Sequence, residues 1–298
     1  MTSNVWVLNA NVGDTSYPIT VSISPDGQAW GTPYDLANLP ACPLFSPSLV
    51  FFNGRIHIAY QGPNNELVIA SSADGLSWTS YSLIAQGQGV KVYTNGAPAL
   101  TAHASSLFVA YADGNNHLVI QQTRDGSTQF NWTDPYDTGQ SSSVGPSIAV
   151  YQGRVYMAFN QGSTLFICFR SFGEDDWGPK VSTNQSVYLA PSLVVFRERL
   201  FIAFVQDVRA YPLLVFSSAD GTTWTQPADL NQETWFAPSL AVLGDTLFVS
   251  WIALPVVEGS SYINVASSID GEKWSPYLNL NRSVGCAPSL GIGAALGT

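Results

Sequence analysis

The chain has 298 residues, 46% of them hydrophobic and only 11% charged, with a formal net charge of −10 at pH 7. An acidic chain without a basic run repels phosphate, so we expect no nucleic-acid partner. No window approaches the roughly 20 consecutive apolar residues of a membrane helix, so no membrane span is expected. The many glycines and prolines beside 12% aromatic residues are typical of an all-β protein rich in turns.

Six short motifs, each ending in tryptophan, recur 45 to 54 residues apart. A fixed period in this range predicts a solenoid, a propeller or an array. Because each repeat needs its neighbours to bury its faces, we expect one domain over 1–298. In chain order the motifs are "SPDGQAW" ending at Trp30, "SADGLSW" at Trp78, "TRDGSTQFNW" at Trp132, "SFGEDDW" at Trp177, "SADGTTW" at Trp224 and "SIDGEKW" at Trp274.

Before each motif the chain shows two apolar runs around a two-residue turn, as in "SPSLVFFNGRIHIAY" from Ser46. Such a pattern predicts a β-hairpin, here named strands A and B. A third run, strand C, leads into the motif, and a more polar strand D follows the tryptophan. Four antiparallel strands per unit, repeated six times, predict a six-bladed β-propeller.

The two ends of the chain hold complementary parts of one unit. The last unit, from Ala287, stops after one strand, whereas the stretches from Val5 and Pro18 fit strands B and C of an incomplete first unit. We therefore expect a blade made of one C-terminal strand and three N-terminal strands. This pairing would close the ring and leave no open sheet edge.

The motif S-x-D-G-x-x-W resembles the Asp-box of sialidases and other six-bladed propellers, with one residue fewer between Asp and Gly. The residues themselves suit a structural turn, because a carboxylate can accept backbone N–H groups and glycine permits a positive φ. A single carboxylate per turn disfavours calcium, and we predict no metal site and no cofactor. The structural role is expected for Asp26, Asp74, Asp125, Asp220 and Asp270.

Alternating strand direction divides the loops between two ends of the molecule. The A–B and C–D turns share one end and are short and uniform. The B–C and D–A connections share the other end and vary in length, the longest being the D–A loop assigned to 79–96. Variable loops on a rigid scaffold are where ligands bind, so this variable face is the expected functional face.

The resemblance to sialidases implies an arginine triad, a Tyr/Glu pair and an aspartic acid. Of eight arginines, only Arg209 and Arg282 are expected on the variable face, so no triad can form there. Other glycosidases need two nearby carboxylates, and no pair is recognisable among the loop carboxylates. The three histidines and three cysteines are scattered. We therefore favour a protein without catalytic activity.

A polar pair followed by an aromatic residue recurs before the strand A proline. Side-chain amides can bind sugar hydroxyls, and an aromatic ring can cover the apolar face of a pyranose. Two alternatives stay open, since amides also cap strand ends and rings also pack between blades. The predicted ligand-binding residues are Asn184, Gln185, Tyr188, Asn231, Gln232, Trp235, Asn281 and Arg282.

These features favour a lectin with several weak glycan sites, similar in architecture to fungal and bacterial propeller lectins, although the Arg/Glu/Trp set of the fucose-binding six-bladed lectins is not matched. Repeated weak sites gain avidity through multivalency. One alternative is an enzyme, a sialidase-like hydrolase or a cyclase, with one axial pocket near loop 79–96 or Glu258. A protein-binding scaffold is another.

No stretch near the N-terminus resembles a signal peptide, so we expect a cytoplasmic protein or one secreted without a leader. Cys42 and Cys286 flank the split blade, and we predict free thiols rather than a disulfide. An oligomer is possible.

Overall fold

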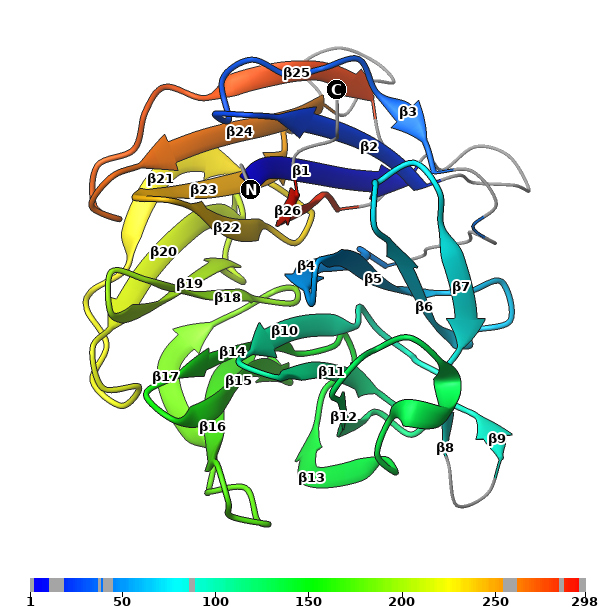
Figure 1. The fold of residues 1–298 in the computed structure, drawn as a ribbon. Coiled ribbons are helices and arrows are strands. Elements are labelled where there is room, and N and C mark those ends of the chain that lie inside the picture. The colour runs from blue at the N-terminus through cyan, green and yellow to red at the C-terminus, as the bar shows by residue number, and fades with distance from the viewer. Residues whose placement is uncertain are drawn as a thin grey trace.

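A computed structural model describes residues 3–10, 19–36, 39, 45–85, 89–253, 262–283 and 287–294. The strands form six four-stranded antiparallel sheets around a common axis, with one small two-stranded ladder beside them (Figure 1). The predicted all-β propeller of four-stranded antiparallel blades is confirmed. Within the described ranges the one helical element is the 3₁₀ turn η1 (Gln129–Asn131), and no helix there is long and apolar enough to cross a membrane.

The blades follow one another along the chain, each running from an inner to an outer strand. Blade 1 is β4 (Ser48–Phe52), β5 (Arg55–Gln61), β6 (Leu67–Ser72) and β7 (Thr79–Ser82); blade 2 is β10 (Ala99–His103), β11 (Ser106–Ala112), β12 (His117–Thr123) and β13 (Tyr136–Ser141); blade 3 is β14 (Ser147–Tyr151), β15 (Arg154–Gln161), β16 (Thr164–Ser171) and β17 (Val181–Ser186). Blade 4 is β18 (Ser192–Phe196), β19 (Arg199–Val205), β20 (Pro212–Ser218) and β21 (Ala228–Glu233); blade 5 is β22 (Ser239–Leu243), β23 (Thr246–Ile252), β24 (Tyr262–Ser268) and β25 (Leu278–Ser283).

The closing blade joins the two ends of the chain. Its order is β26 (Ser289–Ala294), β1 (Ser3–Ala10), β2 (Ile19–Ser24) and β3 (Tyr34–Asp35). The C-terminal strand β26 pairs antiparallel with β1, with Leu290 opposite Val7. The ring is thus closed by backbone hydrogen bonds, which leaves no free inner strand edge there.

The hairpin turns have the geometry that the sequence predicts. Asn53 and Gly54 have φ values of 48° and 73°, and Gln152 and Gly153 have 47° and 72°. Two consecutive positive φ angles define a type I′ turn, whose twist matches that of the flanking strands. These turns fix the register of strand A on strand B.

The hydrophobic core consists of clusters that lie between neighbouring blades. One cluster joins Tyr156 of blade 3 to Phe204 and Phe216 of blade 4, and Trp224 packs against it with its ring 4.7 Å from that of Phe216. The tryptophan that ends each repeated motif therefore packs between blades. The six tryptophans in these clusters are Trp30, Trp78, Trp132, Trp177, Trp224 and Trp274.

The Asp-Gly turn is a self-contained hydrogen-bonded unit. Asp220 Oδ1 accepts the N–H groups of Thr222 and Thr223, both at 2.7 Å. Ser218 Oγ accepts Gly221 N–H at 2.8 Å and donates to Asp220 Oδ1 at 3.0 Å. These bonds stabilise the carboxylate, and the bonds to backbone N–H groups chiefly hold the pKa of Asp220 below its usual range. Asp74 in blade 1 makes the same bonds, which lower its pKa to about 2.

The glycine of the turn lies in close contact with an aromatic ring of the preceding blade. Gly221 has φ +75°, and a Cβ atom there would lie 2.2 Å from Tyr156 Cε1. Gly271 meets Phe201 in the same way. In the divergent fourth motif, Phe172 instead stacks over Phe108, with ring centroids 6.2 Å apart. Contact with the neighbouring blade therefore explains why this glycine recurs.

The substitution Gly221→Ala should destabilise the fold by about 3 kcal/mol, because it combines a strained φ with a clash against the Tyr156 ring. Gly153→Ala is the matched control, since Gly153 has φ +72° but nothing within 4 Å of a built Cβ. The control should lose only about 1 kcal/mol, the cost of the backbone conformation alone. Denaturant unfolding measures both; equal losses would contradict the role of this contact.

A histidine, His57, takes the place of the aromatic side chain that contacts the glycine of the next blade's turn. His57 is the third residue of β5, the place that Phe108, Tyr156 and Phe201 hold in their own second strands. It is fully buried, and neither ring nitrogen has a hydrogen-bond partner among the described residues. Burial, more than the nearby Arg55 charge, lowers its pKa from 6.5 to about 4.

The protein should therefore lose stability in acid through His57. A pKa of about 4 in the folded state and 6.5 in the unfolded state means that the neutral ring stabilises the fold above pH 6.5, and that this contribution disappears as the pH falls through 4. The loss between pH 8 and pH 4 should be about 3 kcal/mol. His57→Phe should remove it, whereas His103→Phe, at an exposed site, should not. Denaturant unfolding curves at pH 8 and pH 4 measure the loss. If His57→Phe lost as much stability as the unchanged protein, the role of His57 would be refuted.

Candidate functional site

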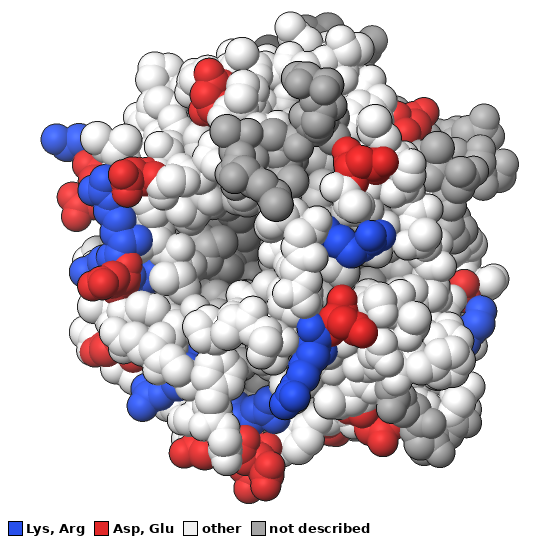
Figure 2. All heavy atoms as spheres, viewed as in Figure 1, with Lys and Arg blue, Asp and Glu red and all other residues white. Residues whose placement is uncertain are grey.

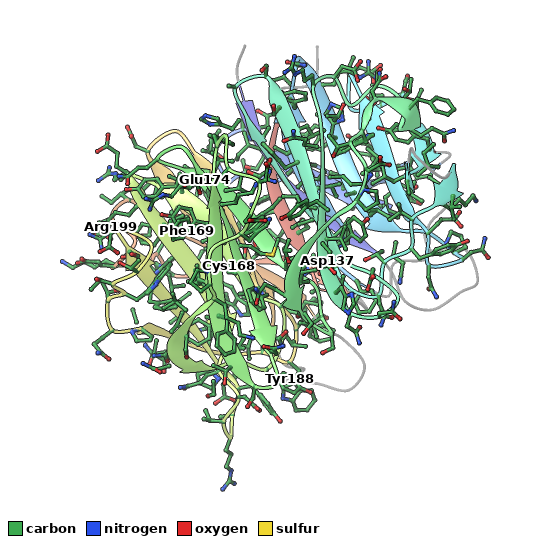
Figure 3. All side chains as sticks on the ribbon, turned by 90° about the horizontal axis from the view of Figure 1, so that it is seen from below. Asp137, Cys168, Phe169, Glu174, Tyr188 and Arg199 are labelled. Atoms are coloured by element: carbon green, nitrogen blue, oxygen red, sulfur yellow. The ribbon has the colours of Figure 1, made fainter. Side chains whose placement is uncertain are left out.

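The two ends of the propeller carry different connections. Glu174, in the turn between β16 and β17, and Tyr188, after β17, lie at opposite ends of blade 3 (Figure 3). The repeated Asp-Gly turns thus share the end of Glu174, and the D–A connections share the end of Tyr188. The predicted division of the connections between two ends holds for the described residues, but the C–D turns are not uniform, because the connection after β12 (124–135) is longer than that after β6 (73–78).

A pair of tyrosines marks the junction between blades 3 and 4 on the variable face. Tyr188 N–H donates to the carbonyl of Val205 in blade 4 at 2.9 Å, which anchors the D–A connection to the next blade. The ring of Tyr188 lies 4.7 Å from the ring of Tyr211, tilted by 45°, and its side chain is 42% exposed. We call Tyr188 and Tyr211 the tyrosine junction.

The same positions hold asparagines between blades 1 and 2. Asn95 N–H donates to the carbonyl of Ala112 in blade 2, and Asn95 Nδ2 donates to Asn116 Oδ1 at 2.8 Å. Asn116 has φ 66°, which asparagine tolerates well, whereas Tyr211 adopts φ 49° although a large side chain disfavours this region. Strain of this kind often persists where a side chain has a functional role. Sequence reasoning missed Tyr211 because its partner lies in another blade.

Trp235 occupies the equivalent position between blades 4 and 5. It follows β21 as Tyr188 follows β17, and its side chain is 55% exposed. The preceding residue, Thr234, is buried, and its hydroxyl accepts Phe236 N–H at 3.1 Å, which fixes the backbone beside the tryptophan. Tyr188 and Trp235 thus expose a large ring to solvent at equivalent positions of two consecutive blade junctions.

The predicted polar pairs lie within the outer strands β17, β21 and β25, not in the D–A loops as the sequence suggested. Asn184, Asn231 and Asn281 have φ values of 58°, 55° and 51°, and Gly139 has 71° at the same place in β13. Irregular register in these sheets accompanies the turn of the backbone. Asparagine and glycine suit this left-handed conformation, which explains the repeated asparagine without a ligand.

The bonds around these pairs are local. The backbone N–H of Asn231 donates to Asp229 Oδ1 at 2.8 Å, and that of Asn281 donates to Asn279 Oδ1 at 2.7 Å. Gln232 Nε2 donates to the carbonyl of Asn231 at 2.8 Å. Gln185 is half-buried beside Asn184, and Arg282 lies in β25. Ligand binding by these pairs stays a prediction.

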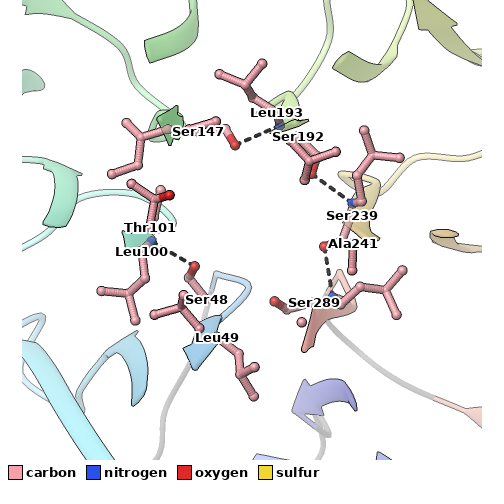
Figure 4. A pocket seen from close by; sticks show the side chains of 18 of the residues that line it. Ser48, Leu49, Leu100, Thr101, Ser147, Ser192, Leu193, Ser239, Ala241 and Ser289 are labelled. Carbon is pink, nitrogen blue, oxygen red and sulfur yellow. Dashed lines mark hydrogen bonds between the residues drawn. The ribbon is translucent and has the colours of Figure 1, made fainter. Parts of the chain in front are cut away.

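A cavity of about 510 Å³ lies on the propeller axis and is walled by the inner strands (Figure 4). Serine hydroxyls of one blade accept a backbone N–H of the next: Ser147 from Leu193 and Ser192 from Leu240, both at 2.9 Å. The lining consists of small, apolar and hydroxyl side chains. Among the described residues it contains no carboxylate, histidine, lysine or arginine.

This lining does not suit general acid–base chemistry. Hydrolysis of a glycosidic bond normally uses two carboxylates about 5–10 Å apart. The axial cavity offers none in the described ranges, and the face in Figure 2 shows its charges scattered, with positive and negative groups interspersed on a mostly uncharged surface. No group of His, Cys, Asp and Glu in the described structure could hold a metal ion.

Some sequence predictions fall elsewhere. Cys42, Cys286 and Glu258 lie outside the described residues, and Cys168 is a buried free thiol. The long loop assigned to 79–96 begins with strand β7, and its remainder holds the ladder of β8 (Ile84–Ala85) and β9 (Val90–Lys91). That segment is therefore partly a β-structured extension of blade 1.

No family model and no curated protein matches the sequence. Three solved structures with similar folds illustrate its structural relatives. AofleA from Arthrobotrys oligospora is 13% identical, with a TM-score of 0.66, and the match covers 94% of this chain and 84% of that one. An α-L-arabinofuranosidase from Clostridium thermocellum is 14% identical, with a TM-score of 0.55 and coverages of 80% and 95%.

The third structure is the Bacteroides ovatus xyloglucan PUL GH43B, which is 14% identical with a TM-score of 0.55. The match covers 82% of this chain but only 56% of that protein, so the chain spans little more than half its length. At these identities the similarity shows the fold alone. The chain is similar to β-propellers, two of whose names describe glycoside-hydrolase proteins.

Proposed function

We propose that this chain is a carbohydrate-binding propeller whose glycan sites lie at the blade junctions of the variable face. The observation that carries the proposal is the tyrosine junction, where two rings replace the asparagine pair that ties blades 1 and 2 together. Exposed rings at fixed positions can cover the apolar faces of sugar rings. The resemblance of the repeated turn to the Asp-box and the carbohydrate-related names of two similar folds support the same class of ligand.

The position of the rings favours binding over packing as their main role. Tyr60 and Trp251, two aromatic residues of the core, are at most 1% exposed, whereas Tyr188 and Trp235 are 42% and 55% exposed. A ring that served only to hold two blades together would gain more from burial. The exposed hydroxyl and ring faces suit a ligand with hydroxyl groups and apolar C–H surfaces.

If the proposal is correct, the intact protein will bind at least one neutral oligosaccharide on a glycan array. Tyr188→Ala and Trp235→Ala should each weaken binding about tenfold or more, the effect of losing one ring stacked on a sugar. Leu76→Ala is the control, because Leu76 is 59% exposed but lies in a C–D turn at the other face. An array without any bound glycan would refute the proposal.

A glycoside hydrolase is the second candidate, and the names of the similar structures favour it more than they favour a lectin. The described part of the axial cavity disfavours a hydrolase, because its lining contains no carboxylate. Glu258 is the acidic residue that the sequence analysis names as a candidate for such a catalytic site. It lies outside the described residues, so only an activity measurement can test it.

We therefore expect no release of nitrophenolate from p-nitrophenyl α-L-arabinofuranoside and no release of arabinose from arabinoxylan above the buffer rate. The physical reason is the lack of an acid–base pair in the described axial cavity. Turnover that Glu258→Gln abolishes would establish the hydrolase instead. Glu233→Gln, which removes a carboxylate at the end of β21, is the control for nonspecific loss.

A further inference from the structure

A second cavity, of about 280 Å³, lies between blades 2 and 3 and is separate from the axis. Its walls come from the ends of β12 and β16 and the start of β13, all near the C–D turns. Phe108 and Ile120 form the buried floor, and Gln122, Thr133, Tyr136 and Arg170 line the sides. It is therefore remote along the blade from the tyrosine junction, at the opposite end of the strands.

One wall of this cavity is rigid. Gln121 is buried, and its Nε2 donates to the carbonyls of Thr133 at 2.7 Å and Ile84 at 3.3 Å. Its Oε1 accepts the Tyr111 hydroxyl at 3.1 Å. Because donor and acceptor groups of this amide are both satisfied, Gln121 ties β12 to β11, to the segment before β13 and to the β8–β9 extension. A ligand would meet a preformed cavity.

The other wall presents a guanidinium group held between rings. The Arg170 guanidinium carbon lies 5.7 Å from the centre of the Tyr136 ring and 6.0 Å from that of Trp177. The Tyr136 hydroxyl donates to Asp176 Oδ1 at 3.2 Å, which fixes the ring. No carboxylate of the described structure lies within salt-bridge distance of Arg170. The rings thus orient the guanidinium while its N–H groups lack an ionic partner.

The chemistry of the walls selects the ligand. Arginine donates hydrogen bonds, and Gln122 and Thr133 can both donate and accept them. Vicinal hydroxyls supply donors and acceptors together, and the Tyr136 ring offers an apolar face. An anion would meet Arg170 but also Asp134 and Asp176, in a protein of net charge −10. The volume suits one sugar ring.

We infer that this cavity is a binding site for a neutral monosaccharide unit, with Arg170 as the main hydrogen-bond donor to its hydroxyls. The site does not depend on the tyrosine junction. It adjoins the long motif that ends at Trp132 and the divergent motif that ends at Trp177, which differ from the others.

The test is saturation-transfer NMR of the full chain with D-galactose, L-arabinose and D-glucuronate, each up to about 50 mM so that weak sites fill. At least one neutral sugar should bind. Arg170→Gln should weaken that binding about tenfold or more, and Arg170→Lys should weaken it similarly, because lysine lacks the planar fork. Arg124→Gln, in a neighbouring turn, and Tyr188→Ala should leave this binding unchanged.

Three outcomes would overturn the inference: no neutral sugar binds, only glucuronate binds, or Arg170→Gln and Arg170→Lys both keep full affinity. Loss of binding in Tyr188→Ala alone would assign the sugar to the tyrosine junction instead. Thermal unfolding of each variant guards against misfolding. Should Arg170→Gln unfold, Gln122→Ala, on the exposed side of β12, provides the second test and should weaken binding severalfold.

Discussion

The hydrogen bond between inner strands of neighbouring blades is the contact on which the rest of the propeller depends. Ser48, Ser147, Ser192 and Ser239 each accept the backbone N–H of a leucine one blade further on, at 2.9 Å (Figure 4). A blade has no core of its own, since its faces are buried only against other blades. At these four junctions the serine bond fixes the height of one blade relative to the next, and the packing between blades follows.

This constraint determines what the outer parts of each blade can do. Once strand A is fixed, the Asp-Gly turn of one blade must meet the second strand of the preceding blade, and only glycine fits against Tyr156, Phe201 and Phe248. At the other end, the D–A connection must cross to the next blade, as the bond from Tyr188 to Val205 shows. The junction residues are thus placed by the scaffold and are free to vary in chemistry.

The period, the recurring tryptophans and the two-residue hairpin turns could be predicted because each depends on residues close in sequence. The asparagines of the polar pairs have two explanations, since the same residue type serves a left-handed backbone and a sugar hydroxyl equally well. Asn184 at φ 58° shows the backbone role, and ligand binding by these pairs stays a prediction. Tyr211 could not be predicted, because its role arises from contact with Tyr188, 23 positions earlier in another blade. Such contacts require the register between blades, which a single sequence does not contain.

The differences among the repeats say more about function than their similarity. Junctions with the same role would carry the same residues. The junction of blades 1 and 2 carries two asparagines, whereas the junction of blades 3 and 4 carries two tyrosines at the same positions. The cavity beside Arg170 likewise lies where one motif is longer than the others and the next departs from them in sequence. A fold shared with hydrolases does not bring their chemistry with it, because the reacting groups must be supplied residue by residue. The described axial wall consists of small, apolar and hydroxyl side chains, so we expect the groups that bind a ligand at the blade junctions.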